Sequence, residues 1–262
     1  MRISLIEGDE GCAYAVKNGC VALVVDALRA SATTAALFDA GATEILVVRE
    51  PEDAFAARAA YPDALLFGER GGLPPEGFDY GNSPLEAAAA AGRRVIFTTT
   101  TGAQRLVACW GAETVYMAST VNASAAIRAA FRHGKEVVII PAGLANDPAF
   151  NAQEDWAAAT AIAMRAVTVA NVTRVPLLVG EGRAELCRWQ ARILEEGLLR
   201  LFETAPHAEK LRQVGLGNEI RYCARLDRTR AVPQAVCRNQ FGVLMKNAAV
   251  GCLDSQGSCR NS

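Results

Sequence analysis

One stretch, Val21-Ala-Leu-Val-Val-Asp-Ala-Leu-Arg-Ala-Ser-Ala-Thr-Thr34, predicts how the rest of the chain is organised. It opens with an apolar run at 21–25, whose β-branched side chains are typical of a strand buried on both faces. Asp26 stands where this strand should end, and Arg29 follows closely. We expect Ser31 to cap an alanine-rich helix over 32–40. Ligands of parallel α/β sheets bind where strands end and helices begin, so Asp26 marks a candidate site.

The composition indicates a chain that can bury a large core. It has 262 residues, of which 51% are hydrophobic, and a net charge of -1. Acidic and basic residues are mixed along the chain, and the absence of a basic stripe argues against nucleic-acid binding. The apolar runs have strand length rather than membrane length, and no secretory signal pattern is evident. We therefore expect a cytoplasmic protein without a membrane or nucleic-acid partner.

The cysteines do not indicate a metal site. There are eight of them and only two histidines, and no Cys-x-x-Cys pair occurs. This spacing argues against a Cys/His zinc site. We expect reduced and mostly buried thiols, as is usual for intracellular proteins, although Cys252 and Cys259 could pair if oxidised.

Strand-like and helix-like runs alternate through most of the chain, which predicts an α/β protein: a three-layer α/β/α sandwich around a largely parallel sheet, with a mixed sheet left open. No flexible linker is evident, so we expect one domain over 1–250 and a polar tail at 251–262. The segment 184–202 carries an apolar helical stripe that suits either core packing or a homodimer. The predicted strands cover 3–6, 21–25, 44–48, 64–67, 94–97, 113–117 and 136–140, and the predicted helices cover 32–40, 51–60, 84–91, 104–110, 123–131, 153–169 and 184–202.

Four polar turns follow predicted strands, at residues 26–34, 68–72, 98–102 and 142–147. Because the carboxyl ends of parallel strands share one edge of a sheet, these turns should meet in a common cleft. Gly and Thr are common in such turns whatever their function, so no single turn is decisive.

The carboxylate of Asp26 is the sharpest candidate. It follows five apolar residues, so it should be partly desolvated and should require a cation or hydrogen-bond donors. A structural ion pair with Arg29 would satisfy it. The alternatives are ligation of Mg²⁺, which favours one or two carboxylates plus phosphate oxygens, and nucleophilic attack on phosphorus.

The second polar turn could hold an anion. Arg70 can grip a phosphate or carboxylate with two hydrogen bonds, and Gly71 and Gly72 allow backbone N–H groups to approach it. An exposed turn in which Glu69 and Arg70 form a solvated ion pair is an equal alternative.

The remaining candidates are polar residues with ordinary structural alternatives. Asp79 could ligate a metal or cap a turn, and Asn82 and Ser83 could donate to an anion or cap the helix predicted at 84–91. The hydroxyl-lined turn before the helix predicted at 104–110 could bind an anion without adding charge; it contains Thr99, Thr100, Thr101 and Gly102. Acids at the start of a helix, such as Glu154 and Asp155, favour its dipole regardless of function. A lone histidine such as His207 is more often structural, although it could donate a proton or contact an anion.

Five motifs occur in an informative order. They are Val25-Asp-Ala-Leu-Arg-Ala-Ser-Ala-Thr33, Gly68-Glu-Arg-Gly-Gly72, Gly77-Phe-Asp-Tyr-Gly-Asn-Ser-Pro84, Thr98-Thr-Thr-Thr-Gly102 and Glu154-Asp155. Together with the later segment Pro206-His-Ala-Glu-Lys-Leu211, this order resembles the 2-phosphosulfolactate phosphatase family. The resemblance extends over the whole chain up to its C-terminal tail.

The resemblance implies a magnesium-dependent hydrolase of phosphate esters of small 2-hydroxycarboxylic acids. The family's named substrate yields sulfolactate and phosphate on the route to coenzyme M. On this reading Asp26 and Arg29 are catalytic, and a small anionic phosphate ester is the partner. The expected ligands of Mg²⁺ are Asp26, Glu69, Asp79 and Asp155. The expected substrate-binding residues are Arg70, Gly71, Gly72, Asn82, Ser83, Thr99, Thr100, Thr101 and Gly102.

One alternative is a binder of anionic phosphorylated metabolites without turnover, because the family usually has Asn and Cys where this chain has Thr101 and Pro141. A general aspartyl-nucleophile phosphatase is disfavoured because Leu28 stands where such enzymes carry a second acid. A dinucleotide enzyme is disfavoured because no Gly-x-Gly-x-x-Gly follows the early strands.

Overall fold

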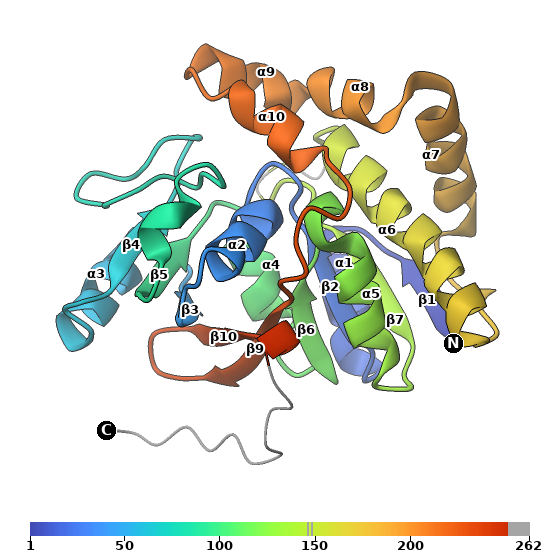
Figure 1. Cartoon of the computed structure of the whole chain (residues 1–262), viewed down its shortest axis with the longest axis horizontal. Coiled ribbons are helices and arrows are strands. Elements are labelled where there is room, and N and C mark those ends of the chain that lie inside the picture. The colour runs from blue at the N-terminus through green and yellow to red at the C-terminus, as the bar shows by residue number, and fades with distance from the viewer. Residues whose placement is uncertain (146, 148, 251–262) are drawn as a thin grey trace.

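The computed structural model describes residues 1–145, 147 and 149–250. Its core is one mixed sheet with the strand order β4-β5-β3-β10-β9-β6-β2-β7-β1-β8 (Figure 1). The strands are β1 (Arg2–Leu5), β2 (Val21–Val25), β3 (Glu44–Val47), β4 (Leu65–Gly68), β5 (Arg94–Thr98), β6 (Thr114–Met117), β7 (Val137–Pro141), β8 (Leu178–Val179), β9 (Pro233–Arg238) and β10 (Val243–Asn247). The seven strands predicted from the sequence are all present.

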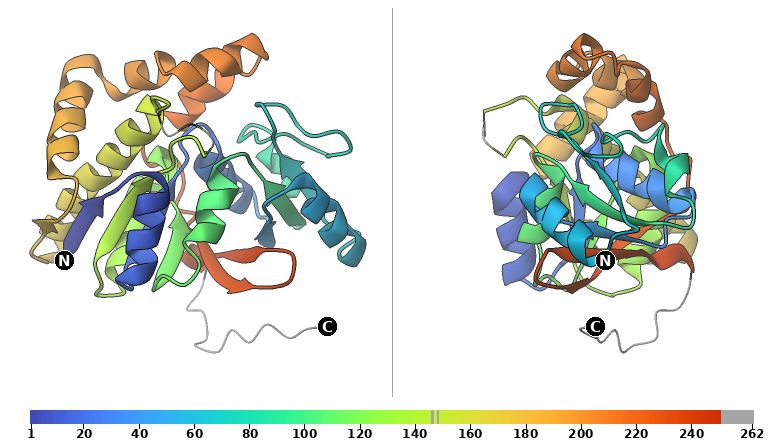
Figure 2. Two further views of the ribbon diagram at one scale, coloured as in Figure 1. Left: turned by 180° about the vertical axis from the view of Figure 1, so that it is seen from behind. Right: turned by 90° about the vertical axis from the view of Figure 1, so that its left-hand side faces the viewer.

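Helices cover both faces of the sheet, so the predicted three-layer α/β/α arrangement is confirmed. Figure 1 shows α2, α5 and α6 on one face, and the reverse view in Figure 2 shows α1, α3 and α4 on the other. The helices are α1 (Gly8–Lys17), α2 (Ala30–Asp39), α3 (Pro51–Ala60), α4 (Gly102–Ala108), α5 (Ala123–Phe131), α6 (Gln153–Thr173), α7 (Arg183–Glu196), α8 (Leu198–Glu203), α9 (Pro206–Gln213) and α10 (Asn218–Cys223), with 3₁₀ turns η1 (Ala87–Ala90), η2 (Thr120–Asn122) and η3 (Ala248–Val250).

The central strand β2 is buried on both faces, as its apolar run predicts. All five of its residues are buried, and it pairs in parallel with β6 and β7. Val21, Leu23 and Val25 belong to the core beneath α5 and α6, whereas Ala22 and Val24 belong to the core beneath α1 and α4. Asp26 therefore leaves the sheet at its middle.

The sheet is mixed because a hairpin joins two parallel halves. β9 and β10 pair with each other and lie antiparallel to β6 and β3 respectively. In the turn between them, the Asn239 side chain accepts the N–H groups of Phe241 and Gly242, each at 3.0 Å. The sequence analysis did not predict this hairpin or the short edge strand β8.

Two helix predictions were wrong in detail. The helix predicted at 84–91 is a turn followed by the 3₁₀ segment η1. The helical stripe at 184–202 is interrupted at Gly197, whose φ of 86° favours glycine, so α7 and α8 are separate helices. Helices α1, α9 and α10 were not predicted.

The helices from α8 to α10 lie beyond the carboxyl ends of the strands, at the top of Figure 1. The preceding helix α7 packs on α6, where the rings of Trp189 and Trp156 stack at 6.4 Å between centroids. Much of the apolar stripe of 184–202 is thus used within the chain, and the homodimer stays a prediction.

No helix in the described part of the chain is both long and apolar enough to cross a membrane. Free thiols occur at Cys12, Cys20, Cys109, Cys187 and Cys223, and all of these except Cys187 are buried. The predicted tail at 251–262, with Cys252 and Cys259, lies outside the described residues.

Candidate active site at the carboxyl edge of the sheet

Asp26 lies at the end of β2 with only 9% of its surface exposed. Its Oδ1 accepts the backbone N–H of Ala30, the first residue of α2, at 3.2 Å. Ser31 is not the helix cap that the sequence predicted. Its hydroxyl instead accepts the Asp26 N–H and donates to the carbonyl of Val24, both at 3.0 Å, and thereby fixes the turn that carries Asp26.

Arg29 does not pair with Asp26, so the structural bridge considered in the sequence analysis was wrong. Its guanidinium forms a buried ion pair with Glu219 of α10, and these side chains are 2% and 3% exposed. It also donates to the carbonyl of Gly72 at 2.8 Å. Arg29 therefore ties the turn after β2 to the turn after β4 and to the helices above the sheet edge.

Glu69 joins the second and third polar turns. One of its carboxylate oxygens accepts the N–H of Thr100 at 2.7 Å, and the other accepts the N–H of Gly72 at 3.0 Å. Gly71 and Gly72 have φ angles of 63° and 91°, a conformation that other residues rarely adopt. The two glycines are thus required by the backbone path that brings Gly72 back to Glu69.

The guanidinium of Arg70 is engaged by groups other than Asp26. It donates to the backbone carbonyls of Glu69 and Arg49, both at 2.7 Å, and to the Thr98 hydroxyl at 3.1 Å, and it forms an ion pair with Glu50. These contacts fix the second turn against β5. Direct binding of substrate by Arg70 stays a prediction.

Asp155 links the fourth polar turn, at 142–147, to the turn that carries Asp26. Its Oδ1 accepts the N–H of Ala27 at 2.7 Å, and its Oδ2 accepts the N–H of Gly143 at 3.0 Å. Asp155 and its neighbour Glu154 lie in the first turn of α6, and both are buried. Segments that are far apart in the sequence thus converge beside Asp26.

Glu154 pairs with the histidine that the sequence left isolated. Its Oε1 lies 3.1 Å from Nδ1 of His207, in the first turn of α9. Its Oε2 is buried and has no hydrogen-bond partner in the described residues.

Burial and the charges of neighbouring groups shift the pKa values in this cluster. Burial, with contributions from Glu69 and Glu154, raises the pKa of Asp26 to about 6, although His207 opposes the shift. Burial and the charges of Glu154 and Asp26 also raise the pKa of Asp155. For His207, burial acts to lower the pKa, but Glu154, Asp26 and Glu69 raise it overall. Four carboxylates and one imidazole thus form one electrostatic unit.

The threonine turn, which ends at Gly102, packs against Asp26. The hydroxyl of Thr99 accepts the N–H of Ala103 at 3.0 Å, and that of Thr101 accepts the N–H of Ala145 at 3.3 Å. Gly102 packs directly on Asp26, because a Cβ atom built there would lie 2.7 Å from Asp26 Oδ2. The turn therefore sets the position of the Asp26 carboxylate.

Gly102→Ala is expected to lower kcat by about 10-fold or more, because its methyl group must displace the Asp26 carboxylate or Ala30. Gly81→Ala is the matched control, since a Cβ at Gly81 meets its nearest atom at an ordinary 3.6 Å. Steady-state kinetics of both variants test this. Wild-type kcat in Gly102→Ala would contradict a role for this close packing.

Three predicted site residues have no hydrogen bond or ion pair to this cluster in the described structure. Asp79 lies beside β4, accepts the Leu66 N–H at 2.8 Å and pairs with Arg58. Asn82 and Ser83 are buried in the loop before η1, where Ser83 accepts the N–H of Leu85 at 3.3 Å. Asn82 Oδ1 is buried without a partner in the described residues.

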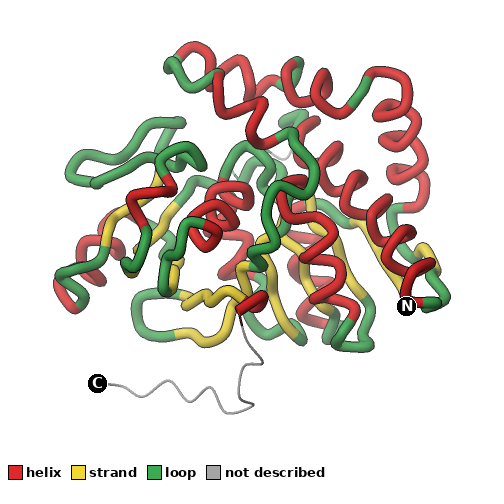
Figure 3. The backbone as a smooth tube through the Cα atoms, viewed as in Figure 1, coloured by secondary structure: helices red, strands yellow, loops and turns green. Residues whose placement is uncertain are grey.

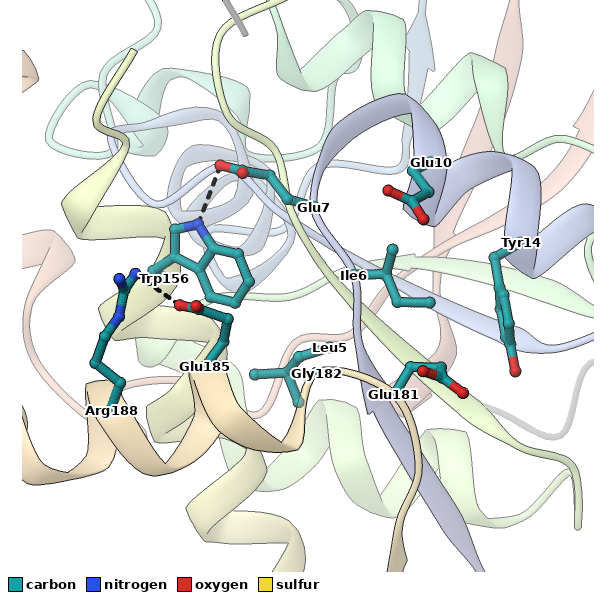
Figure 4. A pocket seen from close by; sticks show the side chains of 10 residues that line it. All are labelled: Leu5, Ile6, Glu7, Glu10, Tyr14, Trp156, Glu181, Gly182, Glu185 and Arg188. Carbon is teal, nitrogen blue, oxygen red and sulfur yellow. Dashed lines mark hydrogen bonds and ion pairs between the residues drawn. The ribbon is translucent and has the colours of Figure 1, made fainter. Parts of the chain in front are cut away.

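A cavity of about 600 Å³ lies between α1, α6 and α7 (Figure 4). Trp156 donates to Glu7 there at 3.1 Å, and Glu185 pairs with Arg188. The cavity is also lined by Glu10 and Glu181. A predominance of carboxylates over this single arginine repels a phosphate ester, so this cavity is a poor candidate for the substrate site.

Comparison with known proteins identifies the relatives of this chain. Residues 9–237 match the family described as 2-phosphosulpholactate phosphatase. The chain belongs to the 2-phosphosulfolactate phosphatase family. The resemblance seen in the sequence motifs is therefore confirmed.

Three relatives of this family illustrate how far the similarity extends, and each is named probable 2-phosphosulfolactate phosphatase. The protein from Deinococcus radiodurans is 36% identical over 226 residues, covering 82% of this chain and 88% of the relative. That from Thermus thermophilus is 35% identical over 246 residues, covering 92% and 96%. That from Gloeobacter violaceus is 34% identical over 233 residues, covering 87% and 92%.

The carboxylates of this family member suit a hard divalent cation. Among the described residues, no group of three or more His, Cys, Asp or Glu side chains forms a ready metal site. Mg²⁺, however, usually keeps several waters and takes only one or two carboxylates. Asp26 Oδ2 accepts no hydrogen bond in the described structure, and burial, together with neighbouring carboxylates, raises the pKa values of Asp26 and Asp155. The donor set therefore fits magnesium.

Two contacts of the site were missed from the sequence. Glu219 precedes the buried Ile220 and lies one turn from the buried Cys223. An acid on an apolar helix face is only a weak signal of a buried ion pair, so Glu219 was not predicted as a site residue. The pairing of Glu154 with His207 had no local signal, because 53 residues separate the partners.

Proposed function

We propose that this chain hydrolyses the phosphate ester of a small 2-hydroxycarboxylic acid in a magnesium-dependent reaction, with 2-phosphosulfolactate as the leading substrate. The observation that carries the proposal is the convergence of Glu69, Asp155 and four polar turns on the buried carboxylate of Asp26. The family and the names of its members support the same chemistry. The proposed products are sulfolactate and phosphate.

Asp26, Asp155 and Glu69 are the residues that would hold Mg²⁺, and the ion would supply charge stabilisation to the phosphoryl group. Asp79 is a weaker candidate, because its charge is paired with Arg58 and it has no hydrogen bond or ion pair to the cluster around Asp26 in the described structure. Phosphoryl transfer depends mainly on alignment and charge stabilisation. The chain provides alignment by fixing its carboxylates with backbone N–H groups.

Arg29 acts on this arrangement through Gly72. Its guanidinium holds the Gly72 carbonyl, and the Gly72 N–H in turn donates to Glu69. Because Glu219 already balances its charge, we assign Arg29 to positioning rather than to direct neutralisation of phosphate.

Phosphate release from a panel of phosphorylated 2-hydroxy acids tests the proposed function. The wild-type protein is expected to release phosphate from 2-phosphosulfolactate or a close analogue with Mg²⁺, and to lose at least about 100-fold in rate with a chelator. Matched samples with magnesium restored control for damage by the chelator. Tight binding without release under every condition would instead identify a non-catalytic binder.

A further inference from the structure

His207 is held rigidly beside the carboxylate cluster by groups that the proposed function does not use. Its Nδ1 lies 3.1 Å from Glu154 Oε1, and the Glu154 side chain is only 1% exposed. The ring of Phe150 meets the imidazole edge-to-face at 6.0 Å between centroids. These two contacts fix the plane and the orientation of the imidazole ring.

The other ring nitrogen of His207 is free. Nε2 makes no hydrogen bond or ion pair with any described residue, and 34% of the side chain is exposed. A histidine bound at Nδ1 by a buried carboxylate presents Nε2 as its proton-exchanging atom. His207 is linked to the turn of Asp26 through Glu154, because the next residue, Asp155, accepts the N–H of Ala27 at 2.7 Å.

The charges around His207 favour its protonated form. Glu154 faces it from α6, Asp26 from the end of β2 and Glu69 from the end of β4, and together they raise its pKa. The nearest cation on its own helix, Lys210, rests over the ring of Phe150 at 4.7 Å. These charges therefore favour an imidazolium that has a proton to give away.

The other members of the cluster are less well placed than His207 to give a proton to the substrate. Asp26 is ionised above its pKa of about 6, and both oxygens of Asp155 accept backbone N–H groups. Both oxygens of Glu69 do the same. An ester of an aliphatic hydroxy acid, however, leaves as a strongly basic alkoxide that needs a proton.

We propose that His207 is the general acid of this site, protonating the leaving oxygen of the substrate through Nε2, while Glu154 positions its ring. This inference rests on the proposed phosphatase function. In the step, the bond between phosphorus and the ester oxygen breaks and its electron pair stays on that oxygen. The proton of Nε2 moves to the same oxygen, as the incoming nucleophile forms its bond to phosphorus. Neutral His207 remains bound to the Glu154 carboxylate and regains a proton, which balances the proton released by the water molecule that becomes part of the phosphate product.

Changing the basicity of the leaving group separates this role from a structural one. We would compare 2-phospholactate with its 3,3,3-trifluoro analogue, whose alkoxide is a much weaker base of similar shape. His207→Asn retains a donor near the Nδ1 position, and His207→Gln retains one near Nε2, but neither can give up a proton. Lys210→Gln is the matched control on the exposed side of α9, and thermal melting verifies the fold of each variant.

Both His207 variants are expected to lose at least about 100-fold in kcat with 2-phospholactate and less than about 10-fold with the trifluoro ester. In addition, Glu154→Gln should move the basic limb of the wild-type pH–kcat profile to lower pH, because it removes the charge that favours the imidazolium. Lys210→Gln should behave like the wild type with both esters.

The outcomes distinguish failure of this inference from failure of the proposed function. If the wild type releases phosphate but the folded His207 variants lose the same factor with both esters, His207 is not the general acid. If the wild type releases phosphate from neither of these esters nor from 2-phosphosulfolactate with Mg²⁺, the phosphatase proposal is overturned, and the general-acid role is overturned with it.

Discussion

Asp26→Asn is expected to lower kcat for phosphate release by about 10²–10⁴-fold while leaving the fold intact. The substitution keeps the shape of the side chain, and its amide oxygen can still accept the Ala30 N–H that Oδ1 now accepts. It removes, however, the negative charge at the point where Glu69 and Asp155 converge. Steady-state kinetics at saturating Mg²⁺, with circular dichroism to verify folding, measure the effect.

Asp79→Asn is the matched control for this prediction. Asp79 was predicted from the sequence as a metal ligand, but its carboxylate binds Arg58 and the Leu66 N–H beside β4. We expect kcat within about threefold of the wild type and a loss of about 1 kcal/mol in the free energy of unfolding. Equal loss of activity in Asp26→Asn and Asp79→Asn would contradict the placement of the site.

The same Asp26→Asn substitution is expected to stabilise the metal-free protein at alkaline pH. Burial raises the pKa of Asp26 from 3.8 to about 6, so the folded state binds a proton more tightly than the unfolded state does. Stability from this group is present below about pH 4 and is lost as the pH rises through 6. The variant should therefore melt like the wild type at pH 4 but be more stable at pH 8, by a margin on the order of 3 kcal/mol.

A variant that is inactive and yet more stable at pH 8 would show that the wild type tolerates a destabilising buried charge at this position for the sake of function. Melting curves in the presence of a chelator provide the measurement. A lower melting temperature for Asp26→Asn at pH 8 would contradict the burial argument, because it would mean that the ionised carboxylate is stabilised by its surroundings.

The position of Asp26 could be predicted because it depends on local pattern and on one general rule. Five consecutive apolar residues indicate a strand buried on both faces, and parallel strands end at the same edge. The same rule correctly brings together the turn of Glu69, the threonine turn and the turn of Gly143. These predictions need the order of elements along the chain but not the details of side-chain packing.

The partners of individual side chains could not be predicted, because they depend on contacts between distant elements. Arg29 is three residues from Asp26, yet it pairs with Glu219, 190 residues away. Arg70 looked free to hold an anion, but backbone carbonyls and Glu50 engage its guanidinium. Asp79 was predicted as a metal ligand because of the motif in which it stands. The structure instead places its loop against β4, where its carboxylate accepts the Leu66 N–H.

The helices above the sheet edge illustrate the same limit. The apolar pattern at 184–202 predicts one long helix, but Gly197 breaks it, and the chain turns to place α8, α9 and α10 over the carboxyl edge. This turn places His207 and Glu219 at the site. Neither the residue types nor their spacing in the sequence predict this placement.

Glu219→Gln is expected to lower the free energy of unfolding by about 3–5 kcal/mol, because it leaves the buried charge of Arg29 without its counter-ion. For a chain of this size the melting temperature should fall by roughly 10 °C. Arg221→Gln is the matched control on the same helix, since its ion pair with Glu203 is exposed and should contribute less than about 1 kcal/mol.

Replacing both partners separates stability from activity. In Arg29→Met/Glu219→Leu, no charge is left buried, so most of the stability lost in Glu219→Gln should return. Activity should not return, because the guanidinium that holds the Gly72 carbonyl, and with it the Gly72–Glu69 contact, is absent. A stable double variant with kcat reduced at least about 10-fold would establish that Arg29 positions the second turn for catalysis. Recovery of kcat together with the melting temperature would instead reduce Arg29 to a packing role and remove it from the functional residues.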